Sequence, residues 1–133
     1  MERIYRYSIT IMSGGNISVH DEDGSIWITP ARVEEGNVTR EDIVRVPPDG
    51  TTEVRHPASS EFPFHLSIYK NRPDLRAIDH VHPVYATAFS PAQKKPDVRT
   101  IPESYIFLRD VQALPFAWAY RDGKEIADAV TPE

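Results

Sequence analysis

Prolines interrupt this chain so often that long regular elements are excluded. The 133 residues include 12 prolines and 6 glycines. Proline removes a backbone donor and ends helices or central strands, so the segments between these breaks predict short strands and short helices. The length suits a single domain, 1–133, and a composition that is 40% apolar is enough for a small core.

A β-hairpin is the clearest element that the pattern predicts. In NISVHDEDGSIWITP, residues 16–30, Ile17 and Val19 alternate with polar residues, DEDG forms a turn, and Ile26 and Ile28 alternate again. Residues that favour β-structure predict further strands within 3–12, 38–46, 75–83 and 105–116.

Three segments predict helices, within 59–73, 84–90 and 122–130. In the first, Ser59 or Ser60 can cap the helix, and Glu61 falls in the first turn, where the helix dipole favours a carboxylate. Strands come first and then alternate with helices, which predicts an α/β or α+β layered domain with a mixed sheet.

Charge and cysteine content narrow the function. Acidic residues number 20 against 15 basic ones, and no dense basic stripe occurs, so we expect no nucleic-acid partner. There is no cysteine, which leaves imidazole, carboxylate and water as metal ligands and favours a cytoplasmic location. The first residues do not form a signal peptide, and no apolar run predicts a membrane span.

The pair His80 and His82 raises the question of a metal site. Alternate residues of a strand point to the same face, so two imidazoles here can share a divalent ion, while Asp79 points away. Pro83 places the pair at the carboxyl end of its strand, where open α/β sheets tend to hold their sites. The alternative is a half-exposed strand with two surface histidines.

Three other segments offer polar groups. In SGGNIS, residues 13–18, backbone N–H groups can approach an anion, or the glycines make a plain turn. ITPARVEEGNV, residues 28–38, is a strand that breaks into a polar loop. SSE, residues 59–61, can bind an anion at a helix N-terminus and offer Glu61 as a base, or it is an ordinary cap.

Taken together, these segments resemble the class II aldolase/adducin head family. The segments that carry the likeness are GGNIS, ITPAR, EDIVRV, then DG, and SSEFPFHLSIYKNRPDLRAIDHVHP. The resemblance implies a three-layer α/β/α domain with a central mixed, largely antiparallel sheet. It also implies that 1–133 lacks the C-terminal part of that domain and has a reduced N-terminal end.

The resemblance assigns roles to individual residues. It implies that His80 and His82 bind Zn²⁺ or another divalent metal, and that Glu61 is the catalytic acid/base. It implies that Gly15, Asn16, Ser59 and Ser60 hold a substrate phosphate. The expected reaction cleaves a C–C bond of a small hydroxyketone or sugar phosphate through a zinc-stabilised enediolate, with the pKa of Glu61 raised toward neutrality. His65 is interpreted as a packing or supporting residue.

Two departures from the family pattern leave alternatives open. Ala31 and Arg32 replace the small pair of TPSG, and the Arg32 guanidinium can bind phosphate or carboxylate. The third zinc histidine of the family is expected beyond Glu133. Three alternatives follow. The chain is a fragment, or it binds a metal more weakly through two histidines with Glu61 and water, or it is an adducin-like assembly module without catalysis. An epimerase or decarboxylase is a further alternative, and a homotetramer is the expected assembly.

Overall fold

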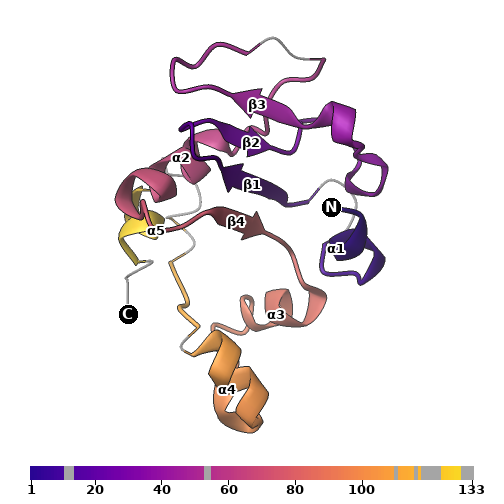
Figure 1. Cartoon of the computed structure of the whole chain (residues 1–133). Helices are drawn as coiled ribbons and strands as arrows, with labels where there is room; N and C mark the ends of the chain where they lie inside the picture. The colour runs from indigo at the N-terminus through magenta and orange to yellow at the C-terminus, as the bar shows by residue number, and fades with distance from the viewer. Residues whose placement is uncertain (11–13, 53–54, 110, 116, 118–123, 130–133) are drawn as a thin grey trace.

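The computed structural model describes residues 1–10, 14–52, 55–109, 111–115, 117 and 124–129, and its centre is a four-stranded sheet (Figure 1). The strand order is β3-β2-β1-β4, and each neighbouring pair is antiparallel. The strands are β1 (Asn16–His20), β2 (Ile26–Ile28), β3 (Val44–Val46) and β4 (Ala77–His80).

The predicted hairpin is confirmed by the pairing of β1 with β2, in which Ser18 lies opposite Ile28. Its turn needs a glycine, because Gly24 has φ +83°. The Gly24 amide donates to the Asp21 carbonyl, and the Asp23 carboxylate accepts from the Ser25 amide. The turn therefore fixes the register that puts alternate residues of β1 on one face.

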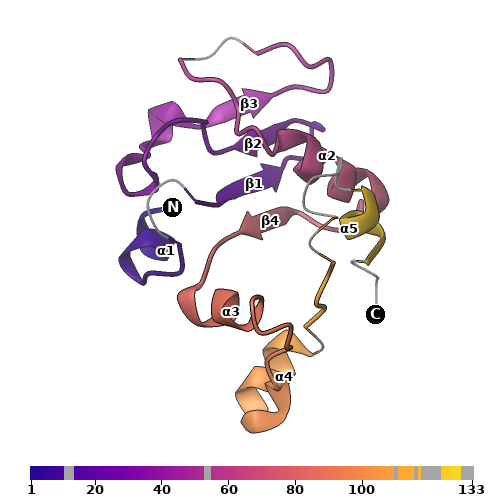
Figure 2. The same cartoon turned by 180° about the vertical axis from the view of Figure 1, so that it is seen from behind.

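Helix α2 lies along one face of the sheet with α5 beside it, while α3 and α4 lie beyond the β4 edge (Figures 1 and 2). The α-helices are α1 (Glu2–Arg6), α2 (Phe62–Asn71), α3 (Val84–Phe89), α4 (Pro102–Leu108) and α5 (Lys124–Ala129). Short 3-10 turns are η1 (Glu35–Asn37), η2 (Arg40–Asp42) and η3 (Val98–Thr100). In the described part of the chain no helix is both long and apolar enough to cross a membrane.

Two strand predictions were wrong over the described residues of their segments, while residues 11, 12, 110 and 116 lie outside the described ranges. The segment 3–12 contributes to α1, whose acidic Glu2 and basic Arg6 lie at the ends that the helix dipole favours. The segment 105–116 contributes to α4, which begins at Pro102, where the fixed φ of proline suits a first helical turn. The β-propensity of these residues was outweighed by the placement of charges in α1 and by the proline at the start of α4.

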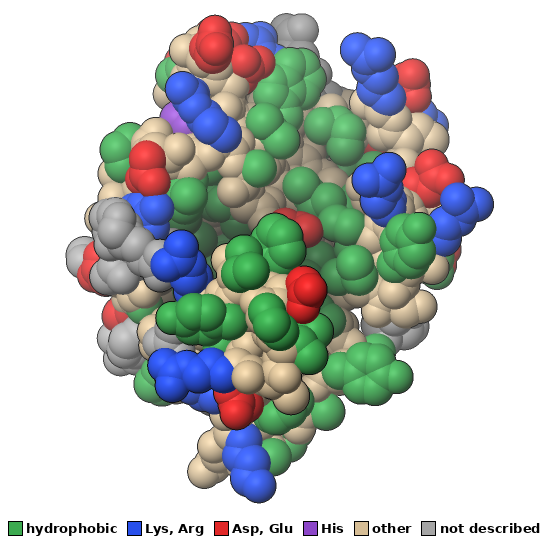
Figure 3. All heavy atoms as spheres, turned by 60° about the horizontal axis from the view of Figure 1, so that its bottom comes forward, with side chains coloured by type: hydrophobic (Ala, Val, Ile, Leu, Met, Phe, Trp, Pro, Cys, Tyr) green, Lys and Arg blue, Asp and Glu red, His purple; other side chains and the backbone are tan. Residues whose placement is uncertain are grey.

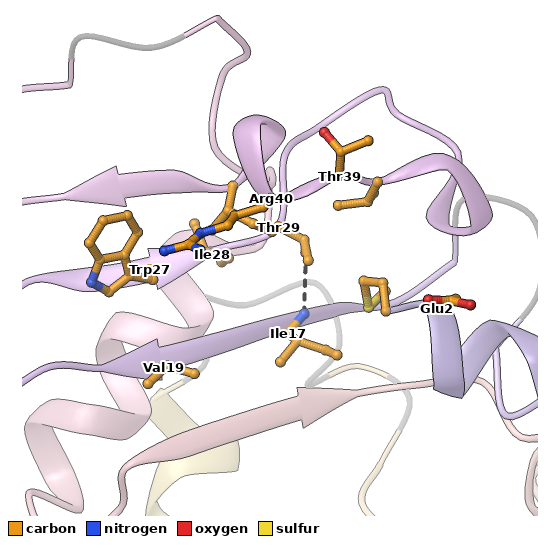
Figure 4. A pocket seen from close by; sticks show the side chains of 11 residues that line it. Glu2, Ile17, Val19, Trp27, Ile28, Thr29, Thr39 and Arg40 are labelled. Atoms are coloured by element: carbon orange, nitrogen blue, oxygen red, sulfur yellow. Dashed lines mark hydrogen bonds between the residues drawn. The ribbon is translucent and has the colours of Figure 1, made fainter.

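The core lies between the sheet and the start of α2. Ile28, Val44 and Val46 form it, with Ala58 and Phe62 packed against them. The other face of the sheet is less covered: a pocket of about 450 Å³ opens there beside Ile17, Val19 and Trp27 (Figure 4).

The α/β class and a largely antiparallel sheet are confirmed. The strands in the described ranges make only antiparallel pairs, so the expectation of a mixed sheet was wrong there. The third layer and the single-domain boundary stay predictions.

Candidate functional site

Backbone pairing brings three distant segments to one place. In the β1–β4 ladder, Asn16 lies directly opposite His80, so both side chains lie on the same face. Beyond β2, an isolated bridge joins Pro30 to Ala58, and the Ser59 amide donates to the Thr29 carbonyl. This bridge delivers Glu61, the residue that precedes α2, to the face that carries Asn16 and His80.

Glu61 forms the centre of the cluster. Its Oε2 accepts a hydrogen bond from Nδ2 of Asn16 at 2.5 Å and one from Nδ1 of His80, also at 2.5 Å. The bond from His80 is the main cause that lowers the pKa of Glu61 to about 2, burial acts in the opposite direction, and Asn16 lowers it further. The same bond raises the pKa of His80. Glu61 is therefore ionised here, so the expectation of a pKa raised toward neutrality was wrong for this structure.

The two histidines of the H-x-H motif face each other. Nε2 of His80 and Nε2 of His82 are 3.2 Å apart, and the ring of Phe64 meets His80 edge-on. Two imidazole nitrogens that share a tetrahedral zinc ion are separated by about 3.3 Å. The pair therefore fits a divalent metal, and Glu61 on the remote nitrogen of His80 is the kind of carboxylate partner that orients a ligating imidazole.

The described residues supply two candidate metal ligands, His80 and His82. Within the ranges that the structure describes, no group of three or more histidine, aspartate or glutamate side chains is arranged to hold a metal ion. Glu61 reaches Nδ1 of His80 and is bonded there, so it stands behind the imidazole and not beside its Nε2. Asp79 lies opposite Ile17, on the other face of the sheet, as the alternation predicted.

Gly15 allows β1 and β4 to approach each other closely beside the site. It has φ +93°, and a Cβ at this position would lie 2.4 Å from the carbonyl oxygen of His80. A side chain is therefore excluded by both the backbone conformation and the neighbouring strand. The hydroxyl of Thr10, fully buried, donates to the Gly14 carbonyl and ties down the preceding residue.

The other predicted anion-binding residues lie around this centre. Ser59 Oγ accepts from the Glu61 amide at 3.3 Å, and Ser60 is exposed. Asn16 turns its amide to Glu61. Arg32 is exposed and has φ +64°, two residues beyond the bridge at Pro30. The structure thus brings Gly15, Asn16, Glu61, His80 and His82 together, with Ser59 next to them and Arg32 farther along its loop.

Sequence reasoning interpreted His65 as a packing or supporting residue, but it missed the polar group that His65 forms with Ser18 and Tyr69 behind the site. Ser18 Oγ lies 2.7 Å from Nδ1 of His65 and 2.8 Å from the hydroxyl of Tyr69. His65 is fully buried, and its burial lowers its pKa to about 4, so it is neutral. The signal was present: Asn16 and Ser18 alternate on a strand, and Glu61, His65 and Tyr69 recur every four residues on a helix.

The fold and this cluster define an α/β domain with a histidine pair and a glutamate at one end of an antiparallel sheet. The chain belongs to the class II aldolase and adducin family: residues 1–133 match the Class II Aldolase and Adducin N-terminal domain.

Two relatives show how similar the sequences are. The L-fuculose phosphate aldolase of Methanococcus vannielii is 37% identical over 108 residues, which are 81% of this chain and 58% of that protein. The L-fuculose phosphate aldolase of Escherichia coli K12 is 38% identical over 78 residues, 59% of this chain and 36% of that protein. The chain thus spans little more than half the length of the Methanococcus relative.

Solved structures share the fold. The L-fuculose-1-phosphate aldolase from Thermus thermophilus superposes with a TM-score of 0.78 at 27% identity, covering 97% of this chain and 65% of that one. YgbL from Escherichia coli, described as a putative aldolase/epimerase/decarboxylase, gives 0.62 at 29% identity, covering 67% and 43%. The likeness to the Thermus enzyme includes almost the whole chain.

Proposed function

We propose that this domain carries the catalytic centre of a metal-dependent aldolase-type lyase acting on a small hydroxyketone or sugar phosphate. The observation that carries the proposal is the contact of Glu61 with His80 at 2.5 Å, beside a histidine pair spaced for one metal ion. The family and its L-fuculose phosphate aldolase members support a phosphorylated substrate. The proposal extends to this class of substrate and not to one sugar.

His80 and His82 would hold the metal through their Nε2 atoms, and Zn²⁺ is the ion that we propose first. When bound, such an ion supplies a Lewis acid that polarises the substrate carbonyl. His80 keeps its Nδ1–H on Glu61, which fixes both its tautomer and the orientation of its ring.

Glu61 would move the proton that the reaction requires. Cleavage of a C–C bond next to a carbonyl leaves a carbon that must take up a proton, and a carboxyl group beside that carbon can deliver it. Two hydrogen bonds now hold Glu61 ionised. To carry a proton near neutral pH, the carboxyl group has to give up one of them when substrate binds.

The groups around Glu61 would bind the anionic end of the substrate. Gly15 and Asn16 line one side of the cluster, and Ser59 and Ser60 precede α2, whose N-terminus attracts negative charge. Arg32 would add a guanidinium in place of the small residue of the family pattern. These assignments rest on the resemblance and on the position of each segment next to Glu61.

Metal content tests the proposal. Purified protein is expected to bind about one Zn²⁺ per chain, and His80→Ala/His82→Ala is expected to lose it. Glu61→Gln should keep the metal but lose at least about 10²-fold in turnover of a ketose 1-phosphate. Retention of zinc by the double variant would exclude the histidine pair as the ligands, and full turnover by Glu61→Gln would exclude Glu61 as the proton carrier.

A noncatalytic assembly module of adducin type is the second candidate. It is favoured by the finding that the described residues supply two clustered nitrogen ligands and no third. Protein that binds no zinc and self-associates would support it. An epimerase or decarboxylase on the same scaffold is distinguished from the aldolase by the products formed from one sugar phosphate.

Self-association is part of both proposals. Side chains of α4 are strongly exposed although apolar, and Figure 3 shows hydrophobic side chains gathering on this side of the molecule. Exposed apolar patches of this kind often mark interfaces. We propose a homo-oligomer, with a tetramer as the form that the family resemblance implies, and light scattering after size-exclusion chromatography measures it.

A further inference from the structure

The interface between the sheet and α2 has two unlike halves. One half is apolar and consists of the core around Ile28, with Phe62 packed on it. The other half is polar, although it is buried just as deeply: Asn16, Ser18 and His65 are each exposed by no more than 4%. The polar half lies directly behind Glu61 and His80.

Two hydrogen-bonded links cross the polar half in parallel. Asn16 of β1 joins Glu61, and Ser18 of β1 joins His65 of α2. Two residues of a strand advance about 6.6 Å, and four residues of a helix advance about 6.0 Å, so the two spacings agree. The links therefore keep one fixed register between β1 and the beginning of α2.

Ser18 connects two side chains of α2. Its Oγ lies within hydrogen-bonding distance of both Nδ1 of His65 and the hydroxyl of Tyr69, and the tautomer of His65 sets which group donates in each bond. Burial raises the pKa of Tyr69, so its hydroxyl keeps its proton. Burial lowers the pKa of His65 to about 4, so its ring is neutral.

This buried polar arrangement lowers the stability of the fold. Nε2 of His65 and Oδ1 of Asn16 are both buried without a hydrogen-bond partner among the described residues. Each such atom destabilises a protein, because it has lost water and gained no partner. Apolar side chains would avoid that loss, as the other half of the same interface does, so the polar half needs a reason besides stability.

We propose that Ser18 and His65, with Tyr69 behind them, are positioning residues that hold the start of α2 against β1 and thereby set Glu61 against His80. Glu61 precedes the first turn of α2, and the ends of helices fray. The Ser18–His65 link lies one turn further in, where it steadies that turn. The inference rests on the proposed function, in which Glu61 and His80 are the working pair.

The test replaces both partners of the link with apolar residues. Ser18→Ala/His65→Leu removes the link and also leaves the buried Tyr69 hydroxyl without its Ser18 partner, so a lower urea midpoint of unfolding is expected. The zinc Kd is expected to rise about tenfold, the usual effect of losing support behind a metal ligand. Val46→Ala, in the apolar half, is the matched control: it should lower stability without changing the zinc Kd.

Nuclear magnetic resonance gives a measurement that needs no metal. In ¹⁵N-labelled wild type, the Nδ1–H signal of His80 is expected far downfield and slow to exchange with water. In the double variant the His80 signal should be lost to exchange. Tyr69→Phe, which removes one hydroxyl, gives the same comparison if the double variant does not fold.

The outcomes separate the two ideas. A folded double variant with an unchanged His80 signal and unchanged zinc Kd would overturn the positioning role. A wild type that binds no zinc would overturn the proposed function, and the His80 signal alone would then decide whether Ser18 and His65 position Glu61.

Discussion

Substituting Gly15 with alanine tests how closely β1 and β4 must approach for the site to form. The glycine has φ +93°, and an added Cβ would lie 2.4 Å from the His80 carbonyl oxygen. The conformation alone costs about 1–2 kcal/mol for a residue with a side chain. The contact lies well inside van der Waals distance and its partner is backbone, so we expect a total loss of about 3 kcal/mol or more in the free energy of unfolding.

Gly50 provides the matched control. It has φ +76°, but an added Cβ there would have no atom within 4 Å. Gly50→Ala should therefore show the conformational loss alone, about 1–2 kcal/mol. Urea unfolding of the three proteins measures both values. Equal losses at the two positions would refute the claim that Gly15 is required by the approach of His80. Weaker zinc binding is also expected for Gly15→Ala, since His80 has to move.

Three further predictions concern stability and anion binding. Glu35 is 3% exposed, and burial raises its pKa from 4.5 to about 7. Between pH 4.5 and pH 7 the carboxyl group of Glu35 therefore ionises in the unfolded chain but not in the folded one. The wild type should lose at most about 3 kcal/mol of stability as the pH rises through this range. Glu35→Gln should remove that loss in urea unfolding at pH 4 and pH 8, while Glu22→Gln at an exposed position should not. Arg32→Gly should raise stability by up to about 1 kcal/mol, because Arg32 has φ +64°, which glycine adopts more easily. The same variant should be stabilised less than the wild type by inorganic phosphate in thermal unfolding. An unchanged phosphate effect would exclude Arg32 from the anion site. Ile28→Ala, at a position 1% exposed, should lower the free energy of unfolding by about 2–5 kcal/mol, and a loss below 1 kcal/mol would place the core elsewhere.

The elements that the sequence predicted well are those whose signals are local. The hairpin at 16–30 combines strict alternation with a turn that needs a glycine at Gly24, and α2 has a proline near its start. The predicted serine cap of α2 was wrong, because Glu61 is the residue that precedes the helix and no side chain caps it. The errors at 3–12 and 105–116 have a different cause. Isoleucine, tyrosine and phenylalanine suit strands and helices alike in short segments, and the outcome there depended on the charges of α1 and on Pro102.

The sequence predicted which side chains lie close together better than it predicted how they are arranged. The spacing of His80 and His82 predicted a shared face, and the structure puts their Nε2 atoms 3.2 Å apart. The same reasoning did not predict that Glu61 would bond to Nδ1 of His80, which lowers its pKa instead of raising it. A strand pattern fixes which face a side chain takes, but the choice between two ring nitrogens depends on the partner that arrives from another element.

That partner arrives through a connection with little sequence signal. The bridge between Pro30 and Ala58 joins the end of β2 to the residues before α2, and it is what sets the position of Glu61 along the sheet. Phe62 then fastens the helix to the apolar half of the interface, and His65 fastens it to the polar half. Glu61 is therefore held from three directions before any ligand binds, and under the proposed function such preorganisation would spare the reaction the free energy of ordering its acid/base group. If so, variants that loosen the bridge, Phe62 or His65 should each weaken the Glu61–His80 contact, although none of them touches a reacting atom.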